Sequence, residues 1–451
     1  MIQESTFVSQ DTGSANRPLL LGQRARKLLS PYLACFRLVE VLAHLCFHSV
    51  RLAVRLLLNS VGRKQRSRTA LFGQSMAELC ASLGATFIKI GQILSTRCDL
   101  FPPEVTTPLT KLQDRVKPFS FRFVPAIIQA QFGRPQTEIF TEFEEHPISS
   151  ASIASVYRAR LASGPQVAVK IRRPQVVRKV RNDLRLMRFM ARCLARIPAM
   201  RLIPVVEMVD KLGNCIEQQL DLRIEAQNTQ HFREQFAHNS QIQIPALVEE
   251  YCTEAVLVME FIDGLIRIDE LDWEEAEYQQ SLITGLRALY HMIFLDGFIH
   301  CDLHPGNFYL LKGGRVVILD SGFIAKMNQD DRHQFAKFFL NIATNSGKNC
   351  ACIIYETASY KTATFDRKGF ECAIIELINR SAGSKASAFQ VAPFVAEIFD
   401  IQRRFGLRGS PSFTMAILSL LVFEGIAKQC YPQLDFQAEA RPILLQALAQ
   451  R

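Results

Sequence analysis

Between residues 297 and 322, an otherwise apolar stretch carries two acids and an amide at fixed intervals. Asn307 follows Asp302 by five residues, and Asp320 lies thirteen residues further on. Carboxylate and amide oxygens suit Mg²⁺, which bridges substrate phosphates. In enzymes that transfer a phosphoryl group from ATP, residues at these intervals supply one group that orients the acceptor and two metal ligands. We predict that Asp302 orients the acceptor and that Asn307 and Asp320 are the metal ligands. His300 would brace the loop. The alternative is a polar turn with a helix-capping Asp.

Phosphoryl transfer also needs a cation on the α and β phosphates. Residues 166–170 read Gln-Val-Ala-Val-Lys, a short strand that ends in Lys170. The segment just before this strand, residues 147–159, stands where a nucleotide-covering loop belongs. It contains no glycine, so its backbone is more restricted than that of a glycine-rich loop. The small residues that we expect to cover the nucleotide are Ser149, Ser150, Ala151 and Ser152.

A lysine that contacts phosphates needs a carboxylate to hold it. Glu225 is the candidate, although it lies 55 residues after Lys170, a separation that implies an inserted helix. The alternative is an ordinary glutamate on a solvated helix face.

The coarse pattern of elements predicts an α+β, two-lobed architecture like that of a protein kinase. Residues 70–135 and 174–237 are expected to be helical. Short runs with β-branched residues predict strands at 139–144, 154–161, 166–172, 243–251, 255–262 and 315–319. The expected regions are an N-terminal extension (1–69), a helical region packed on the cleft (70–135), a small β-sheet lobe with inserted helices (136–264) and a helical lobe (265–451).

Composition limits the classes of function. The 451 residues are 48% hydrophobic and 21% charged, which is globular. The twelve cysteines are scattered without zinc-ligand spacing, as in proteins of a reducing compartment. Eleven Lys and Arg against three acids in residues 1–70 supply +8 of the net charge of +10. Because most of the excess positive charge lies in this extension and not on a folded binding face, we do not expect a nucleic-acid-binding protein.

The extension predicts a helix after Pro31, within residues 28–61. Six polar residues form one stripe on it, at Arg37, Glu40, His44, His48, Arg51 and Arg55. We expect these charges to interrupt the segment too often for a membrane-spanning helix. With the basic cluster at 63–68, it would suit an anionic membrane surface. The alternatives are a helix docked on its own domain and a mitochondrial transit segment.

The chain resembles the UbiB family of atypical kinases, also called the ADCK or AarF family, over about residues 70–435. The most specific sign is residues 87–100, which resemble the family's Lys-x-Gly-Gln signature (Lys89 to Gln92) and its Ser-x-Arg-x-Asp continuation (Arg97, Asp99). Residues 112–114, Leu-Gln-Asp, also resemble the family. The segment 300–307 resembles its His-x-Asp-x-His-Pro-Gly-Asn motif.

This resemblance implies that Lys89 and Gln92 point into the active site, where a peptide substrate would otherwise lie. It implies ATP hydrolysis, or action on a lipid-like molecule, in place of protein phosphorylation. Residues 149–152 would replace the family's Ala-rich loop. Residues 259–264, with Glu260, would form the hinge whose backbone binds adenine.

The implied cofactors are ATP and Mg²⁺. The implied partners are an anionic membrane surface, prenyl lipids or quinone intermediates, and quinone-biosynthesis proteins. The implied role is in ubiquinone biosynthesis, peripherally on the cytoplasmic side of the inner membrane or, alternatively, in mitochondria.

Three positions depart from the family pattern. Ser321 replaces the usual Phe of the metal motif, and Leu303 stands where Pro is common. Gln219 replaces the first Glu of a Glu-x-Asp motif, and an amide pairs less strongly with an ammonium group than a carboxylate does. Two other functions therefore stay open: a conventional kinase toward a protein or small molecule, and a nucleotide-binding scaffold without activity.

Overall fold

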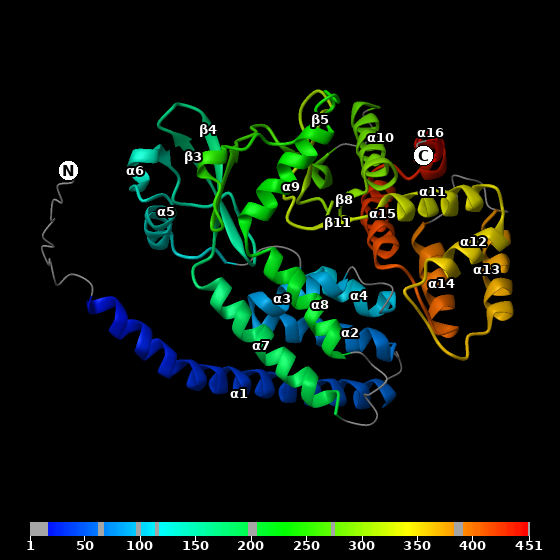
Figure 1. Ribbon diagram of the computed structural model, residues 1–451, viewed down its shortest axis with the longest axis horizontal. Coiled ribbons are helices and arrows are strands. Elements are labelled where there is room, and N and C mark those ends of the chain that lie inside the picture. The colour runs from blue at the N-terminus through cyan, green and yellow to red at the C-terminus, as the bar shows by residue number, and fades with distance from the viewer. Residues whose placement is uncertain are drawn as a thin grey trace, which may run out of the picture.

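The computed structural model describes residues 17–61, 67–95, 101–112, 117–196, 205–271, 276–382 and 391–449. Within these ranges the chain forms a small lobe with a β-sheet and a larger helical lobe (Figure 1). The predicted two-lobed α+β fold is therefore confirmed. The motif residues Arg97, Asp99 and Asp114, and the basic residues 63–66, lie outside the described residues.

The small lobe is built on an antiparallel sheet in the order β1-β3-β4-β6, with β2 paired to β3. These strands are β1 (Phe140–Phe143), β2 (Ser149–Ser150), β3 (Ala154–Leu161), β4 (Gln166–Arg172) and β6 (Val256–Glu260). Val169 and Ile171 of β4 are buried in a core that includes Val124 and Ile128 of α5 (Val124–Phe132). Because side chains alternate along a strand, Lys170 points to the opposite face of the sheet.

Three helices are inserted between β4 and β6: α7 (Val176–Leu194), α8 (Val205–Gln218) and α9 (Leu222–Gln235). Their apolar residues, among them Leu184 and Ile216, form a second core with Ile90 of α3. The helices that precede the sheet are α2 (Arg68–Leu83), α3 (Ala85–Ser95), α4 (Pro103–Thr110), the 3₁₀ turn η1 (Phe121–Phe123), α5 and α6 (Gln136–Ile139).

The larger lobe surrounds the third and largest core. Its helices are α10 (Ala276–Tyr290), η5 (His291–Asp296), α11 (Gln329–Ala343), α12 (Gly347–Glu356), α13 (Arg367–Ala382), α14 (Val391–Arg404), α15 (Pro411–Cys430) and α16 (Phe436–Ala449). Its strands are β7 (Ile266–Arg267), β8 (Phe298–His300), β9 (Phe308–Leu310), β10 (Val316–Ile318), β11 (Ile324–Lys326), β12 (Tyr360–Lys361) and β13 (Leu407–Arg408). The strand pairs β8–β11 and β9–β10 are antiparallel.

One predicted strand is largely wrong. Of residues 243–251, only the first joins a strand, β5 (Ile242–Gln243), and the last three form a 3₁₀ turn, η3 (Glu249–Tyr251). Pro245 explains the break, because proline has no N–H to donate to a neighbouring strand.

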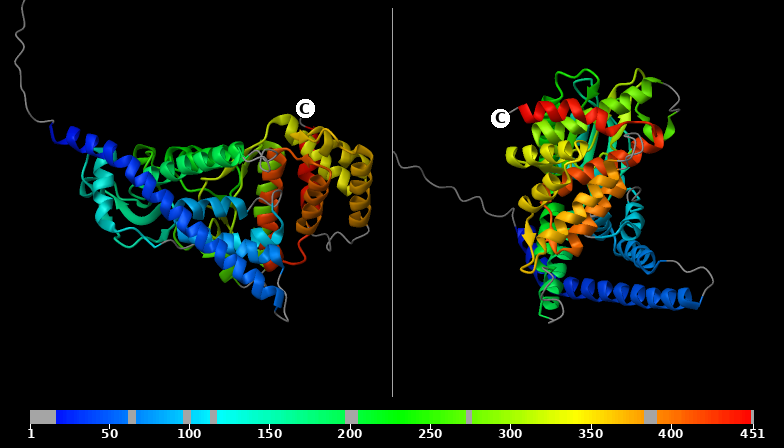
Figure 2. Two further views of the ribbon diagram at one scale, coloured as in Figure 1. Left: turned by 90° about the horizontal axis from the view of Figure 1, so that it is seen from below. Right: turned by 90° about the vertical axis from the view of Figure 1, so that its right-hand side faces the viewer.

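Helix α1 (Arg17–Val61) lies along one edge of the molecule (Figures 1 and 2). It begins well before Pro31, contrary to the expectation that the helix starts after this proline. Arg37 bonds Asp183 of α7 at 2.8 Å, and Arg55 bonds Glu78 of α2 at 3.0 Å. The polar stripe of α1 therefore faces the protein.

Two described helical stretches are long and apolar enough to cross a membrane, by length and composition alone: Phe36–Ser60 and Pro411–Cys430. The second is mostly buried in the helical lobe, whereas 11% of the first is buried. The expectation that charges make residues 28–61 unsuited to spanning is therefore wrong on this measure.

Candidate active site

A cavity of about 660 Å³ lies between the two lobes. Its walls come from α3, from the loop at 147–152 and from the segment between β8 and β11. The predicted site residues that line it are Lys89, Gln92, Ser149, Ser150, Ala151, Ser152, Asp302, Asn307 and Asp320. Segments that are more than 200 residues apart in the sequence thus share one cavity.

Lys170 connects the sheet to this cavity. Its Nζ lies 2.6 Å from Glu225 Oε1 and 3.1 Å from Asp320 Oδ2. The Lys170 and Glu225 side chains are 12% and 8% exposed, whereas that of Asp320 is 45% exposed. One buried ammonium group therefore bridges a buried carboxylate and a carboxylate that faces the cavity.

The three charges change each other's pKa. Burial would lower the pKa of Lys170, but Asp320 and Glu225 raise it above its usual range. Burial would raise the pKa of Asp320, but Lys170 and Lys89 hold it well below its usual range. Burial raises the pKa of Glu225 to about 7, against the effect of Lys170. At neutral pH the arrangement keeps Asp320 ionised, as a metal ligand must be.

The loop after β8 is held by its own polar groups. Asn307 Nδ2 donates to the backbone oxygen of Asp302 at 2.9 Å. His300 is completely buried. Its Nδ1 accepts from the Asp302 backbone N–H at 3.2 Å, and its Nε2 donates to the backbone oxygen of Asp320 at 3.1 Å. Burial lowers the pKa of His300, so the imidazole is neutral at pH 7 and can both donate and accept. This residue joins the two predicted ligand segments.

Asp320 has an unusual backbone conformation. Its φ is +54°, in the left-handed region that Asp tolerates better than most residues. Oδ1 accepts from the Gly322 N–H at 3.2 Å. Ser321 is buried, and its backbone oxygen accepts from Asn228 Nδ2 at 2.9 Å. Hydrogen bonds therefore fix the turn where the family has an apolar Phe.

The residues present fit a Mg²⁺ ion. The Asn307 amide uses its nitrogen to hold the loop, which leaves its carbonyl oxygen for a ligand. Asp320 is ionised, and both residues line the cavity with Asp302. Two or three oxygen donors that line one cavity suit Mg²⁺, because this ion keeps several waters and binds substrate phosphates.

Helix α3 closes one side of the cavity. Gln92 Nε2 donates to the Leu112 oxygen at 2.9 Å, which ties α3 to the segment after α4. Gly91 permits this close approach, since a Cβ there would lie 2.3 Å from a Leu112 methyl carbon. Lys89 lines the cavity near enough to Asp320 and Glu225 to affect the pKa of both. Both residues are thus placed where the family resemblance implies.

The predicted hinge residue Glu260 is not brought to the cavity. Its carboxylate accepts from Gln243 Nε2 at 3.2 Å and from the Ala246 N–H at 3.1 Å. Its own N–H donates to the Ala246 oxygen at 2.7 Å. These bonds engage the Glu260 carboxylate and N–H, so the adenine-binding role of the backbone at 259–264 stays a prediction that would depend on other backbone groups of this segment.

Sequence reasoning missed two residues in or near the cavity. His304 lines the cavity, 3.9 Å from the Asp302 carboxylate. Asn228 lies one helical turn after Glu225, and this spacing could have revealed its role. Gln219, which the sequence marked as a departure from the family pattern, also lines the cavity, and within the described part of the chain both polar atoms of its amide are buried without a hydrogen-bond partner. The amide at this position therefore leaves unused hydrogen-bonding capacity in the cavity wall.

Comparison with known proteins places the chain in a family. The model described as ABC1 atypical kinase-like domain matches residues 111–354, and that described as UbiB helical domain matches residues 374–435. A solved structure titled "The complex structure of Rv3197-erythromycin from Mycobacterium tuberculosis" is similar at 24% identity with a TM-score of 0.47, over 76% of this chain and 91% of that one.

Curated relatives agree with this assignment. The chain is 33% identical over 370 residues to "Probable protein kinase UbiB" of Marinobacter nauticus, covering 80% of this chain and 67% of that protein. It is 32% identical over 371 residues to the protein of the same name from Aeromonas hydrophila, with coverages of 80% and 68%. Because the first domain match spans more than half of the sequence, the chain belongs to the ABC1 atypical kinase family, whose curated relatives carry the name UbiB.

Proposed function

We propose that this protein binds Mg-ATP between its lobes and uses it, by hydrolysis or phosphoryl transfer, to support ubiquinone or related prenyl-lipid biosynthesis at a membrane. The observation that carries the proposal is the ion pair of Lys170 with Glu225 at 2.6 Å, with Asp320 at 3.1 Å from the same ammonium group. Removing a lysine and its carboxylate partners from water costs free energy, so a buried lysine between two carboxylates favours a functional role over a purely stabilising one.

The residues would divide the work as follows. Lys170 would hold the α and β phosphates, and Glu225 would keep its ammonium group in place. Asn307 and Asp320 would hold Mg²⁺, which neutralises phosphate charge when bound. The Asp302 carboxylate, on the cavity wall, would orient the attacking hydroxyl or water and accept its proton.

The position of α3 argues against a conventional protein kinase. Lys89 and Gln92 line the same cavity as Asp302, and a hydrogen bond from Gln92 to Leu112 holds α3 in place. A peptide would have to displace this helix to bring its hydroxyl to Asp302. We therefore favour water or a small lipid-like acceptor.

The outer face of α1 supports membrane association. We define the outer stripe as the exposed apolar residues Phe36, Val39, Leu42, Phe47, Val50, Val54, Leu57 and Leu58. Its members are 48% to 72% exposed, while the arginines on the other face pair with carboxylates of the same chain. Exposed apolar stripes of this length mark interaction surfaces. We propose that α1 lies on the membrane with this stripe in the lipid and stays docked on the protein.

The experiment that tests this function is ATP turnover by the full chain with Mg²⁺. ADP release is measured alone, with anionic liposomes, with a quinone precursor and with a generic protein acceptor. We expect turnover without a protein acceptor and at least threefold stimulation by liposomes. Rapid labelling of the protein acceptor without a lipid response would instead indicate a conventional kinase. Tight Mg-ATP binding without turnover under any condition would indicate a scaffold.

A further inference from the structure

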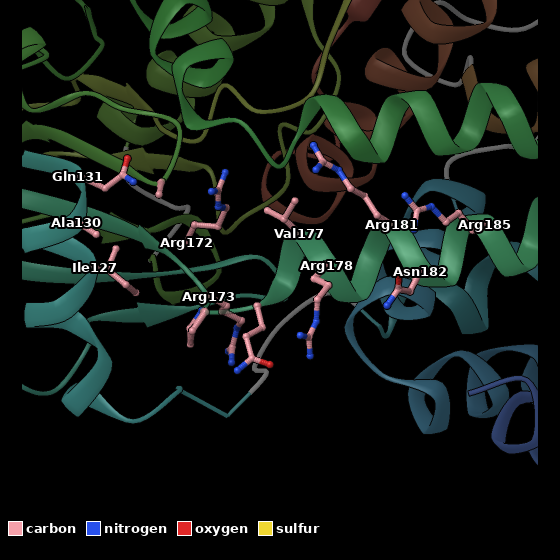
Figure 3. Close-up of a pocket in the computed structure, with 13 residues that line it drawn as sticks. Ile127, Ala130, Gln131, Arg172, Arg173, Val177, Arg178, Arg181, Asn182 and Arg185 are labelled. Atoms are coloured by element: carbon pink, nitrogen blue, oxygen red, sulfur yellow. The ribbon is translucent and has the colours of Figure 1, made fainter. Parts of the chain in front are cut away.

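A second concave site lies away from the cleft, where β4 ends and α7 begins (Figure 3). Its volume is about 510 Å³, and its other wall is α5. Five arginines line it, and none of its lining residues is acidic. We call this site the arginine groove, defined by Arg172, Arg173, Arg178, Arg181 and Arg185.

Three of these arginines, Arg178, Arg181 and Arg185, are exposed, and none forms an ion pair with an acid of the described residues. Further along the same helix, Arg188 lies 2.9 Å from Asp210 and 3.6 Å from Glu217. Clustered like charges repel one another, so the groove is more stable with an anion bound.

The first turn of α7 adds to this positive potential. It contains no acidic residue, and the preceding Gln175 does not cap it with its side chain. The N-terminus of a 19-residue helix carries a partial positive charge. Figure 3 shows Arg178 on one side of this turn and Arg181 and Arg185 on the other, so that the turn lies between guanidinium groups.

Arg173 connects the groove to the predicted nucleotide loop by hydrogen bonds. This guanidinium donates to the Ala151 oxygen at 2.8 Å and to Ser150 Oγ at 2.8 Å. It stands three residues after Lys170, whose side chain reaches the cleft. An anion that binds Arg173 competes with the loop for the same donors.

We propose that the arginine groove binds a phosphate-bearing anion and that its occupancy changes nucleotide affinity through Arg173. A planar guanidinium group can donate two parallel hydrogen bonds to two oxygens of one phosphate. A single helix end offers no such paired donors. Arg172 contributes less, because Leu220 and Glu254 already accept from it. The binding site stands independently of the proposed function, while the coupling rests on the assignment of residues 149–152 as a nucleotide loop.

The binding test uses inorganic pyrophosphate and the full chain in EDTA, without nucleotide, by isothermal titration calorimetry. We expect the double variant Arg178→Gln/Arg181→Gln to bind at least tenfold more weakly than the parent. The matched control is Arg192→Gln/Arg196→Gln, which removes two exposed arginines beyond the groove and should stay within twofold. Equal weakening in the two double variants would overturn the site.

Two further measurements identify the source of the anion and test the coupling. If vesicles of phosphatidylcholine with phosphatidylglycerol bind the groove variant at least tenfold less than its control does, a lipid headgroup is the ligand. If only pyrophosphate binding changes, the ligand is a soluble phosphate. Saturating pyrophosphate should alter the Kd of a fluorescent Mg-ATP analogue at least threefold more in the parent than in the groove variant. Identical shifts in both would disprove the Arg173 link, whether or not the protein turns over ATP.

Discussion

The cleft and helix α1 both hold arginine or lysine residues paired with carboxylates, yet they are arranged in opposite ways. In the cleft, Lys170 is buried between Glu225 and Asp320, and the apolar side chains of β4 face away from it. On α1, the charges also point toward the protein, but Phe47 and Val50 are 61% and 59% exposed. The cleft follows the usual rule for an apolar core with polar chemistry at its edge, whereas α1 reverses it.

This difference shows what each region requires from its surroundings. Burying a charge is costly unless it is paired, and in the cleft the Lys170 ammonium group is paired with both Glu225 and Asp320. Exposing an apolar stripe to water costs free energy, so α1 is more stable when another apolar surface covers the stripe. The cleft is built for a small polar ligand, and α1 is built for an apolar surface.

The largest effect is expected in the cleft. Asp320→Asn removes the charge that Lys170 and a metal ion share, so Mg-ATP binding should weaken at least 100-fold, about 3 kcal/mol. The measurement is titration with a fluorescent Mg-ATP analogue, and Asp330→Asn, an exposed acid on α11, is the control. A variant that binds as tightly as the parent would show that Asp320 is not a metal ligand.

The next effect concerns Asp183, a fully buried carboxylate that α1 reaches through Arg37. Arg37 donates twice to Asp183, which is 1% exposed and also accepts from Thr86 at 2.6 Å. Arg37→Met leaves this charge without its cation, so α1 docking should weaken by about 3 kcal/mol. Hydrogen exchange of the α1 amides measures it.

A matched substitution on the same helix separates burial from charge. Arg51 pairs with Glu78 at 3.0 Å but is 45% exposed. Arg51→Met should therefore change α1 exchange by less than about 1 kcal/mol. Equal effects from Arg51→Met and Arg37→Met would mean that burial of Asp183 does not control docking.

The outer stripe provides the reverse test, in which a charge is added to an apolar face. Phe47→Asp/Val50→Asp should reduce flotation with anionic liposomes at least tenfold, because each side chain contributes about 1.5–3 kcal/mol when buried in an apolar phase. Mg-ATP binding should stay unchanged. The conservative pair Phe47→Leu/Val50→Ile should retain flotation. Full flotation of the Asp variant would exclude the outer stripe as the membrane contact.

The smallest effect is the pH dependence of His300. Burial lowers its pKa in the folded protein, so the unfolded chain binds the proton more tightly. Folding stability should therefore be fully present above pH 6.5 and fall as the pH decreases from 6.5 toward the folded pKa, by at most about 1.4 kcal/mol per pH unit. Thermal melts of the parent and His300→Gln between pH 7.5 and 5.5 measure this. Parallel curves would show that another group causes the acid sensitivity.

Several of these features were predictable because they depend on local order. The intervals between Asp302, Asn307 and Asp320 fall on short segments joined by tight turns, so spacing along the chain translates into spacing in the cleft. Lys170 and Glu225 were paired by chemistry alone, and the structure brings them to 2.6 Å despite 55 intervening residues. The partners of Glu260 were not predictable in this way, because its carboxylate bonds Gln243 and Ala246, which belong to the segment before β6.

The amino-acid sequence by itself determined the two-lobed α+β fold, the types of side chain in the candidate site and the amphipathic character of α1, since these follow from periodicity and local spacing. Only the tertiary structure decided that α1 docks by its polar face, that the Gln219 amide has no hydrogen-bond partner among the described residues, and that five arginines from the end of β4, the connection after it and α7 share one groove. The physical reason is that these properties depend on which distant surfaces meet. Such meetings are set by the packing of whole cores, and no short stretch of sequence encodes them.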